Sequence, residues 1–200
     1  MRYLISGTTS GIGKAIKQKL DPKMIYELNR NEIDLDEPAL VKQIKLPKVD
    51  CAILNAGHDL GGGVPFAEHD EARILKILNC NLVSNVLLAH KLLNNNPDTI
   101  IIFVTSTNVN KQYPNNLVYN LTKLGIKNLH DLIKIDHPGA KVKEARIGLT
   151  KTQFNDNRHK ENHKAINDLY VNKHLTPDIV AERVLDLVVS DKTMAEINAE

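Results

Sequence analysis

The stretch ISGTTSGIGKAI, residues 5–16, places three glycines between a short apolar segment and a helical pattern. Residues 3–5 are apolar like a buried strand, and apolar residues then recur at helical spacing up to residue 20. A glycine-rich turn that opens a helix offers free backbone N–H groups and the positive end of the helix dipole. The stretch therefore predicts a phosphate-binding turn, with an ordinary flexible turn as the alternative.

Composition limits the class of protein. The 200 residues are 42% hydrophobic and 25% charged, as expected for one globular domain over residues 1–200. The net charge of +2 gives no support to a nucleic-acid or membrane-surface partner. No apolar run approaches the roughly 18 residues that span a bilayer, and the first strand begins too early for a signal peptide. Cys51 and Cys80 lie in apolar stretches without CxxC spacing, so we expect reduced thiols and a cytoplasmic protein.

Segments of strand and helix character alternate along the chain. The predicted strands are 3–6, 24–28, 50–54 and 99–105, with 193–198 as a candidate last strand. The predicted helices are 14–20, about 71–93, about 117–135 and 176–189. This alternation predicts an α/β fold with a doubly wound, mainly parallel sheet flanked by helices on both faces. Ligands of such sheets bind at the carboxyl ends of the strands, which is where the glycine-rich turn would lie.

A tyrosine and a lysine follow the buried strand 99–105. Tyr119 and Lys123 are four residues apart, so they share one face of a helix. An ammonium beside a phenol lowers the phenol pKa from its usual value near ~10, and such a phenol can exchange a proton with a carbonyl or an alcohol. Ser106, at the carboxyl end of the strand, is placed to hold the same oxygen. An ordinary surface Tyr–Lys pair is the alternative.

Several short motifs occur in a fixed order on the expected elements. They are Ser6-Gly7-Thr8-Thr9-Ser10-Gly11-Ile12-Gly13, Asp34-Leu35, Asn55-Ala56-Gly57, Asn81, Ser106, and Tyr119 with Lys123. In this order the motifs resemble those of the short-chain dehydrogenase/reductase family, over most of the chain. The resemblance implies a Rossmann-type fold and an NAD(P)-dependent oxidoreductase that interconverts a carbonyl and an alcohol.

The resemblance also implies a role for each catalytic residue. Tyr119 is expected to be the general acid/base, and Lys123 to lower its pKa and bind the nicotinamide ribose. Ser106 is expected to orient the substrate carbonyl, and Asn81 to support a water chain that returns the proton. The partner is then a small carbonyl or alcohol compound. A sensor or scaffold that binds cofactor without turnover is the alternative function.

The cofactor residues follow from the same resemblance. The pyrophosphate is expected at the glycine-rich turn and the adenine at Asp34 and Leu35. The nicotinamide is expected near the loop that contains Gly148, Thr150 and Thr152. The expected cofactor-binding residues are Gly7, Thr9, Ser10, Gly11, Ile12, Gly13, Asn29, Arg30, Asp34, Leu35, Asn55, Ala56, Gly57, Tyr119, Lys123, Gly148, Thr150 and Thr152.

The end of the second strand bears on the choice between NADP and NAD. Members that prefer NAD place an acid there for the ribose 2′-OH, whereas this chain has Asn29 followed by Arg30. An arginine suits a 2′-phosphate, so NADP is the predicted cofactor and NAD stays possible. Glu27 is nearby, but the alternation of a strand can turn its side chain away. Arg30 as a solvated turn residue is the alternative.

The chain departs from the family in three places. The segment from Arg30 to Asp34 is too short for the helix that usually joins these strands, so one helix is expected to be missing. Residues 154–174 are polar, and they form either a substrate lid or a solvated helix and loop. The C-terminus lacks the usual glycine-rich close, which weakens the expectation of a tetramer. The two long helices can still pair across a dimer axis, so a homo-oligomer is expected.

Other polar residues are weaker candidates. His159 and His163 are four apart, but a third zinc ligand is not evident, so no metal site is predicted. His58 follows the Asn55–Gly57 motif and faces either the substrate or water. Tyr113 either shapes the pocket or packs within the protein.

Overall fold

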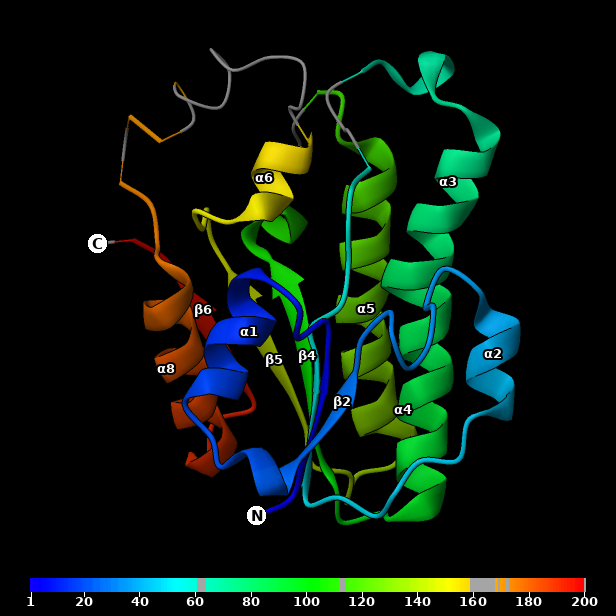
Figure 1. Ribbon diagram of the computed structural model, residues 1–200, viewed down its shortest axis with the longest axis vertical. Helices are drawn as coiled ribbons and strands as arrows, with labels where there is room; N and C mark the ends of the chain where they lie inside the picture. The colour runs from blue at the N-terminus through cyan, green and yellow to red at the C-terminus, as the bar shows by residue number, and fades with distance from the viewer. Residues whose placement is uncertain (61–63, 112–113, 159–167, 169, 172, 200) are drawn as a thin grey trace.

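The computed structural model describes residues 1–60, 64–111, 114–158, 168, 170, 171 and 173–199. Its centre is a six-stranded sheet in the order β2-β1-β3-β4-β5-β6, and each neighbouring pair of strands is parallel (Figure 1). The strands are β1 (Tyr3–Ser6), β2 (Ile25–Leu28), β3 (Cys51–Leu54), β4 (Ile100–Ser106), β5 (Val142–Ile147) and β6 (Met194–Ile197). The strand order reverses at β1, which pairs with β2 on one side and with β3 on the other. A crevice at the carboxyl ends of β1 and β3 is the expected ligand position in such a sheet.

Helices cover both faces of the sheet, which confirms the predicted doubly wound α/β fold. On one face lie α1 (Gly11–Gln18) and α8 (Pro177–Val189), and on the other lie α4 (Ser84–Asn95) and α5 (Leu117–Asp136) (Figure 1). Two apolar cores result, because neighbouring residues of a strand point to opposite faces. Phe103 is buried in the core with α4 and α5, and Val104 in the core with α1 and α8.

The long helix predicted over residues 71–93 is three segments in the structure. It consists of α3 (Glu71–Leu78), a π-helical turn (Asn79–Val83) and α4. The helix is long and apolar enough to cross a membrane by composition alone, but α4 packs on the sheet with Leu88 and Leu92 fully buried, as core helices do. Apolar periodicity predicts the helix but not the π turn, because one wider turn barely changes the pattern.

The flank beyond β2 is short, as predicted. After Leu28 the chain turns at Asn29, whose carbonyl oxygen accepts from the N–H groups of Glu32 and Ile33. It then forms only the six-residue helix α2 (Pro38–Gln43), which packs against α4. β2 is therefore the edge strand, and its carboxyl end is open toward solvent.

Short elements complete the described chain. Single 3₁₀ turns cover Pro22–Met24, Phe66–Glu68 and Thr107–Asn110, and the short helix α6 covers Gln153–Arg158. The candidate last strand is confirmed as β6, which pairs with β5. α6 lies beyond the carboxyl end of the sheet, beside the upper end of α5 in Figure 1.

Candidate active site

The glycine-rich turn joins β1 to α1 at the point where the strand order reverses. Gly7 and Gly11 have φ angles of +73° and +53°, in the left-handed region that favours glycine. A Cβ atom on Gly13 would lie 2.1 Å from the carbonyl oxygen of Gly7. The side-chain amide of Asn55 donates to the carbonyl oxygens of Ser6 and Gly7, at 3.2 and 3.3 Å. Helix α1 therefore starts in close contact with the turn, and the end of β3 holds the turn in place.

A hollow of about 350 Å³ opens in front of the start of α1. Ser10 is the N-cap of this helix, and its side chain makes no capping hydrogen bond to the first-turn N–H groups. The side chain of Thr152 would lie 3.4 Å from a Cβ atom on Gly11. The hollow is lined by Thr9, Ser10, Gly11, Lys14, Lys151, Thr152, Gln153, Asp156 and Pro177. The structure thus brings the predicted Thr152 to the glycine-rich turn.

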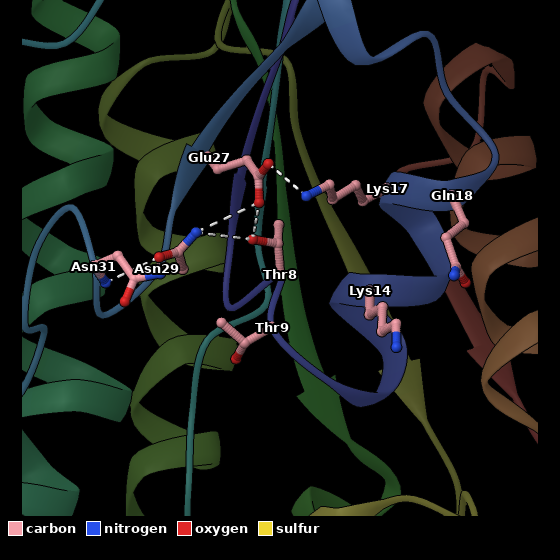
Figure 2. Close-up of a pocket in the computed structure, with 8 residues that line it drawn as sticks. All are labelled: Thr8, Thr9, Lys14, Lys17, Gln18, Glu27, Asn29 and Asn31. Atoms are coloured by element: carbon pink, nitrogen blue, oxygen red, sulfur yellow. Dashed lines mark hydrogen bonds and ion pairs between the residues drawn. The ribbon is translucent and has the colours of Figure 1, made fainter.

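A second hollow, of about 370 Å³, lies between α1 and the carboxyl end of β2. Figure 2 shows the Glu27 carboxylate between Thr8 and Lys17. Lys17 Nζ is 2.6 Å from Glu27 Oε1, and the Thr8 hydroxyl donates to Glu27 Oε2. The Lys17 and Thr8 contacts hold the pKa of Glu27 below its usual value, so the carboxylate is charged at neutral pH. Glu27 lies two residues before Asn29 and so lies on the same side of the chain, and both residues line this hollow. The Glu27 side chain therefore points into the hollow and not away from it.

Asn29 lines the same hollow, whereas Arg30 does not. The Arg30 guanidinium lies 3.6 Å from Asp36 Oδ2, and 68% of the Arg30 side chain is exposed. The other oxygen of Asp36 is 2.7 Å from His58 Nε2. Arg30 is thus loosely held at the edge of the site, and its long side chain is free to turn toward a ligand at the end of β2.

The predicted catalytic residues converge at the carboxyl end of β4. Ser106 is the last residue of β4, and Tyr119 and Lys123 lie in the first two turns of α5. Tyr119 is hydrogen-bonded to the Ser106 side chain. Lys123 Nζ lies 5.6 Å from the centre of the Tyr119 ring and donates to the carbonyl oxygen of Val104 at 2.9 Å. The Tyr-x-x-x-Lys spacing thus places both side chains on the face of α5 that meets β4.

The prediction that Lys123 lowers the pKa of Tyr119 is wrong for this arrangement. Burial raises the pKa of Tyr119 to about 12, and the hydrogen bond with Ser106 only partly opposes this increase. Burial also lowers the pKa of Lys123 to about 8. The physical reason is that Lys123 Nζ faces the Val104 carbonyl and the ring of Tyr119, and does not contact the phenol oxygen. At neutral pH the phenol is neutral and is a proton donor.

Asn81 lies in the π-helical turn and is almost completely buried. Its side-chain oxygen accepts from the His58 N–H at 2.9 Å, and its side-chain nitrogen donates to the His58 carbonyl oxygen at 2.8 Å. A Cβ atom on Gly57 would lie 3.1 Å from Asn81 Oδ1 and 3.7 Å from Lys123 Nζ. The π turn, a feature that often occurs at functional sites, therefore places Asn81 against the loop after β3 and close to Lys123.

Comparisons with known proteins identify the family and the fold. Residues 32–163, well over half of the chain, match the sequence pattern of the short chain dehydrogenase family. The protein belongs to this family. Its fold is that of several solved structures, although their sequence identities are low, and no curated protein matches the chain.

Three of these structures indicate how complete the fold is. A serine dehydrogenase complexed with NADP+ is 22% identical, with a TM-score of 0.83 over 98% of this chain and 94% of that one. A small-chain dehydrogenase in complex with NADPH is 17% identical, with a TM-score of 0.82 over 99% and 96%. An alcohol dehydrogenase from Thermococcus sibiricus, complexed with 5-hydroxy-NADP, is 18% identical, with a TM-score of 0.78 over 100% and 97%. The chain therefore spans nearly the full length of each.

Asp34 and Leu35 were predicted to bind the adenine, but in the structure they contact other parts of the protein. Leu35 is buried in the core with α4 and α5. Asp34 Oδ1 accepts from the N–H of Asp36 at 3.0 Å, so it stabilises its own turn. Ser84 donates to the Leu35 carbonyl oxygen at 2.7 Å, which fixes this segment against α4. Neither Asp34 nor Leu35 lines the two hollows described above.

Gly148 and Thr150, which follow β5 and were predicted to bind the cofactor, also contact other parts of the protein. A Cβ atom on Gly148 would lie 2.6 Å from Asn198 Oδ1, so Gly148 allows the chain after β6 to approach closely. Thr150 is buried and forms a β-bridge with Leu175. The candidates Tyr113, His159 and His163, and much of the predicted lid 154–174, lie outside the described residues.

One buried group of three different side chains is not apparent from the sequence. Atoms of Asp36, His58 and Cys80 that could ligate a metal lie within 4.8 Å of one another. Burial raises the pKa of the Cys80 thiol to about 12, so the thiol stays protonated, and His58 Nε2 already contacts Asp36. We therefore interpret the group as a polar contact between the turn after β2 and the loop after β3. Its members come from separate segments, and no spacing in the sequence indicates that they meet.

Proposed function

We propose that the protein is an NADP(H)-dependent oxidoreductase that reduces a carbonyl to an alcohol, or oxidises the alcohol, by hydride transfer. The observation that carries this proposal is the contact of Tyr119 with Ser106 beside Lys123, at the same end of the sheet as the glycine-rich turn. A structural role alone does not require a buried phenol, a hydroxyl and an ammonium to converge at this end.

The residues of the site fit a dinucleotide. The glycine-rich turn and the uncapped start of α1 would hold the pyrophosphate through backbone N–H groups. Gly57, which leaves space beside Asn81 and Lys123, would admit the nicotinamide ribose. One N–H of the Lys123 ammonium donates to the Val104 carbonyl oxygen. Its other N–H groups would bind the ribose hydroxyls.

The chain's own residues would then control the proton. When bound, the nicotinamide supplies or accepts the hydride. Ser106 would donate a hydrogen bond to the substrate oxygen, and Tyr119 would give that oxygen its proton in the reducing direction. Because Tyr119 is a neutral phenol, it can donate at once, whereas alcohol oxidation first requires that the phenol lose its proton. Lys123, with its low pKa, would favour that loss when it is protonated.

The preference for NADP rests on three residues. Asn29 replaces an acid at the end of β2, Arg30 is exposed and loosely held, and the charge of Glu27 is already paired with Lys17. The serine dehydrogenase and the small-chain dehydrogenase of similar fold were solved with NADP+ and NADPH. An adenosine 2′-phosphate would therefore meet the Arg30 guanidinium and no unpaired carboxylate.

Fluorescence titration with NADPH and NADH tests the cofactor. For Arg30→Ala we expect an NADPH Kd about 10-fold higher, with the NADH Kd changed less than about 2-fold, because one charge-assisted contact to the phosphate is lost. Glu27→Gln is the matched control, since it removes a charge that faces the same hollow but does not bind the phosphate. Equal weakening of both cofactors in Arg30→Ala would contradict the assignment.

Turnover tests the mechanism. Tyr119→Phe keeps the ring but removes the proton donor, so kcat should fall by about 10²- to 10⁴-fold while NADPH still binds. The alternative, a cofactor-binding sensor or scaffold, has one observation in its favour: Lys123 bonds Val104 and not the phenol. It predicts NADPH binding without hydride transfer to any carbonyl tested.

We also propose a homodimer formed through the helices α4 and α5. Their solvent side carries large exposed apolar side chains, namely Val86, Leu117, Leu121, Leu124, Leu132 and Ile135, and Val83 of the π turn continues it. An apolar surface of this kind typically marks a protein interface. Light scattering should give twice the mass of the chain, and Leu121→Asp with Leu132→Asp should give the monomer.

A further inference from the structure

A group of charged side chains meets at the phenol of Tyr119, and the roles proposed above do not use it. Helix α6 approaches Tyr119 with Phe154, whose ring centre lies 5.3 Å from that of Tyr119. Arg158 is four residues further along α6 and so shares the face of Phe154. Its guanidinium reaches Asp59, which follows β3 in the loop that starts at Asn55. The charges of both Arg158 and Asp59 affect the pKa of Tyr119, so both lie near the reacting group.

The pair is buried. Arg158 Nε is 3.2 Å from Asp59 Oδ2, and the two side chains are only 16% and 3% exposed. A second arginine, Arg73 on α3, donates from Nη2 to the Asp59 carbonyl oxygen at 3.2 Å. Three separate elements therefore contribute charged groups to one place above the carboxyl end of the sheet.

Several buried atoms of this group have no hydrogen-bond partner among the residues that the structure describes. They are Asp59 Oδ2, Arg73 Nε and Arg158 Nε. The Arg158–Asp59 contact is close, but its geometry does not make a hydrogen bond. Buried polar atoms in proteins are normally hydrogen-bonded, so their accumulation beside Tyr119 indicates a polar ligand and not a finished structural ion pair.

The charge of the group suits a monoanion. Arg73 and Arg158 carry two positive charges, and Asp59 carries one negative charge. Burial, with the nearby Arg73 charge, lowers the pKa of His69, so His69 is neutral at pH 7. The net charge is therefore +1. The planar guanidinium binds a carboxylate through two parallel N–H donors, and the Arg158 atom nearest to Asp59 is Nε.

We propose that the substrate carries a carboxylate group, which Arg158 and Arg73 bind beside Tyr119. This inference rests on the proposed function, since it names the substrate class of the same site. Asp59 orients Arg158 from below, and Phe154 covers the substrate carbonyl together with Tyr119. The reaction at the carbonyl is the one proposed above, and binding of the carboxylate only positions the substrate carbonyl.

The test compares acids with their neutral esters. The probes are pyruvate, 3-oxobutyrate and 4-oxopentanoate, which place the carboxylate at increasing distance from the ketone, each beside its methyl ester. Binding to the NADP+-loaded protein is measured by calorimetry, and NADPH oxidation by absorbance. We expect at least one acid to bind and to react about 10- to 100-fold better than its ester, as one charge-assisted contact provides.

The variants separate a binding role from a structural one. Arg158→Gln should lower kcat/KM for that acid by about 10- to 100-fold and leave the ester within about 3-fold, and Arg158→Lys should restore part of the loss. Arg2→Gln makes the same change at the opposite end of β1 and should have no effect. If Arg158→Gln does not fold, Arg73→Gln provides the same comparison.

Two results would overturn the inference. One is that no acid binds the NADP+-loaded protein better than its ester. The other is that Arg158→Gln weakens acid and ester equally. Failure of the proposed function is distinguishable, because NADPH itself would then not bind, or an acid would bind by calorimetry and not be reduced.

Discussion

Replacement of Gly13 by alanine tests whether the close approach of α1 to β1 builds the cofactor site. The new Cβ atom would lie 2.1 Å from the Gly7 carbonyl oxygen, 2.7 Å from Asn55 Nδ2 and 2.8 Å from the Gly7 carbonyl carbon. Attractive contacts between heavy atoms are about 3.5 Å or longer, so the start of α1 would have to move by about 1 Å. Two of the three atoms belong to the backbone and cannot rotate away.

The cost follows from this overlap. Overpacking typically costs about 1 to 3 kcal/mol, and rigid backbone neighbours place Gly13→Ala near the upper value. The better helix propensity of alanine returns less than about 1 kcal/mol, so we expect a net loss of about 2 kcal/mol. For a chain of this size the Tm should fall by about 4 to 8 °C. The displaced helix start should also weaken NADPH binding.

Gly139→Ala is the matched control. Nothing lies within 4 Å of a Cβ atom at Gly139, in the turn between α5 and β5. Thermal unfolding followed by circular dichroism, with NADPH titration, compares the two variants. If Gly13→Ala unfolds at the temperature of Gly139→Ala and binds NADPH as tightly as the wild type, the contact between turn and helix is not needed.

Three further predictions concern single side chains. Ser106→Ala removes a hydrogen bond that lowers the pKa of Tyr119, so the rising limb of kcat/KM for alcohol oxidation should move to higher pH; an unmoved limb would exclude the contact. Burial raises the pKa of Asp59 from 3.8 to about 6, so the folded protein binds this proton more tightly than the unfolded chain, and the stabilisation is lost as the pH rises from 4 to 6. Relative to Asp59→Asn, the unfolding free energy of the wild type should therefore fall by about 2 kcal/mol between pH 4 and 7 in urea unfolding, and parallel pH curves would refute this. Glu144→Ala leaves Arg146 buried without its 2.9 Å partner and should cost about 3 kcal/mol in the same assay, whereas a loss below about 1 kcal/mol would mean that water replaces the carboxylate.

Most of the strands and helices could be predicted because local rules decide them, but β5 was missed, since its apolar residues are interrupted by Lys143, Glu144 and Arg146. The apolar run that became β4 is followed by a helix with apolar residues at three- and four-residue spacing, and these patterns depend only on near neighbours in the chain. The short flank after β2 was predictable from length alone, since a few residues cannot form a helix that crosses a sheet. The approximate bounds were close, and the π turn at Asn81 was missed because its signature is one extra residue.

The candidate active site was predictable in part. Tyr119 and Lys123 share a face because helix geometry places residues four apart together, and Ser106 ends a buried strand. The direction in which the Tyr119 pKa moves was not predictable, because it depends on burial by α6 and on where Lys123 finds its acceptor. The side chain of Glu27 shows the same limit: alternation along β2 fixes its side of the strand, but Lys17 and Thr8 determine what it contacts.

By itself, the sequence determined the family, the class of fold and the glycine-rich turn, because short motifs, their order along the chain and local apolar patterns carry this information. Only the tertiary structure decided which charges meet. Asp59, Arg73 and Arg158 come from a loop and two helices spread over 100 residues, and they converge because the parallel strands end at one edge of the sheet. Contacts of this kind are set by the packing of whole elements, and no local pattern records them.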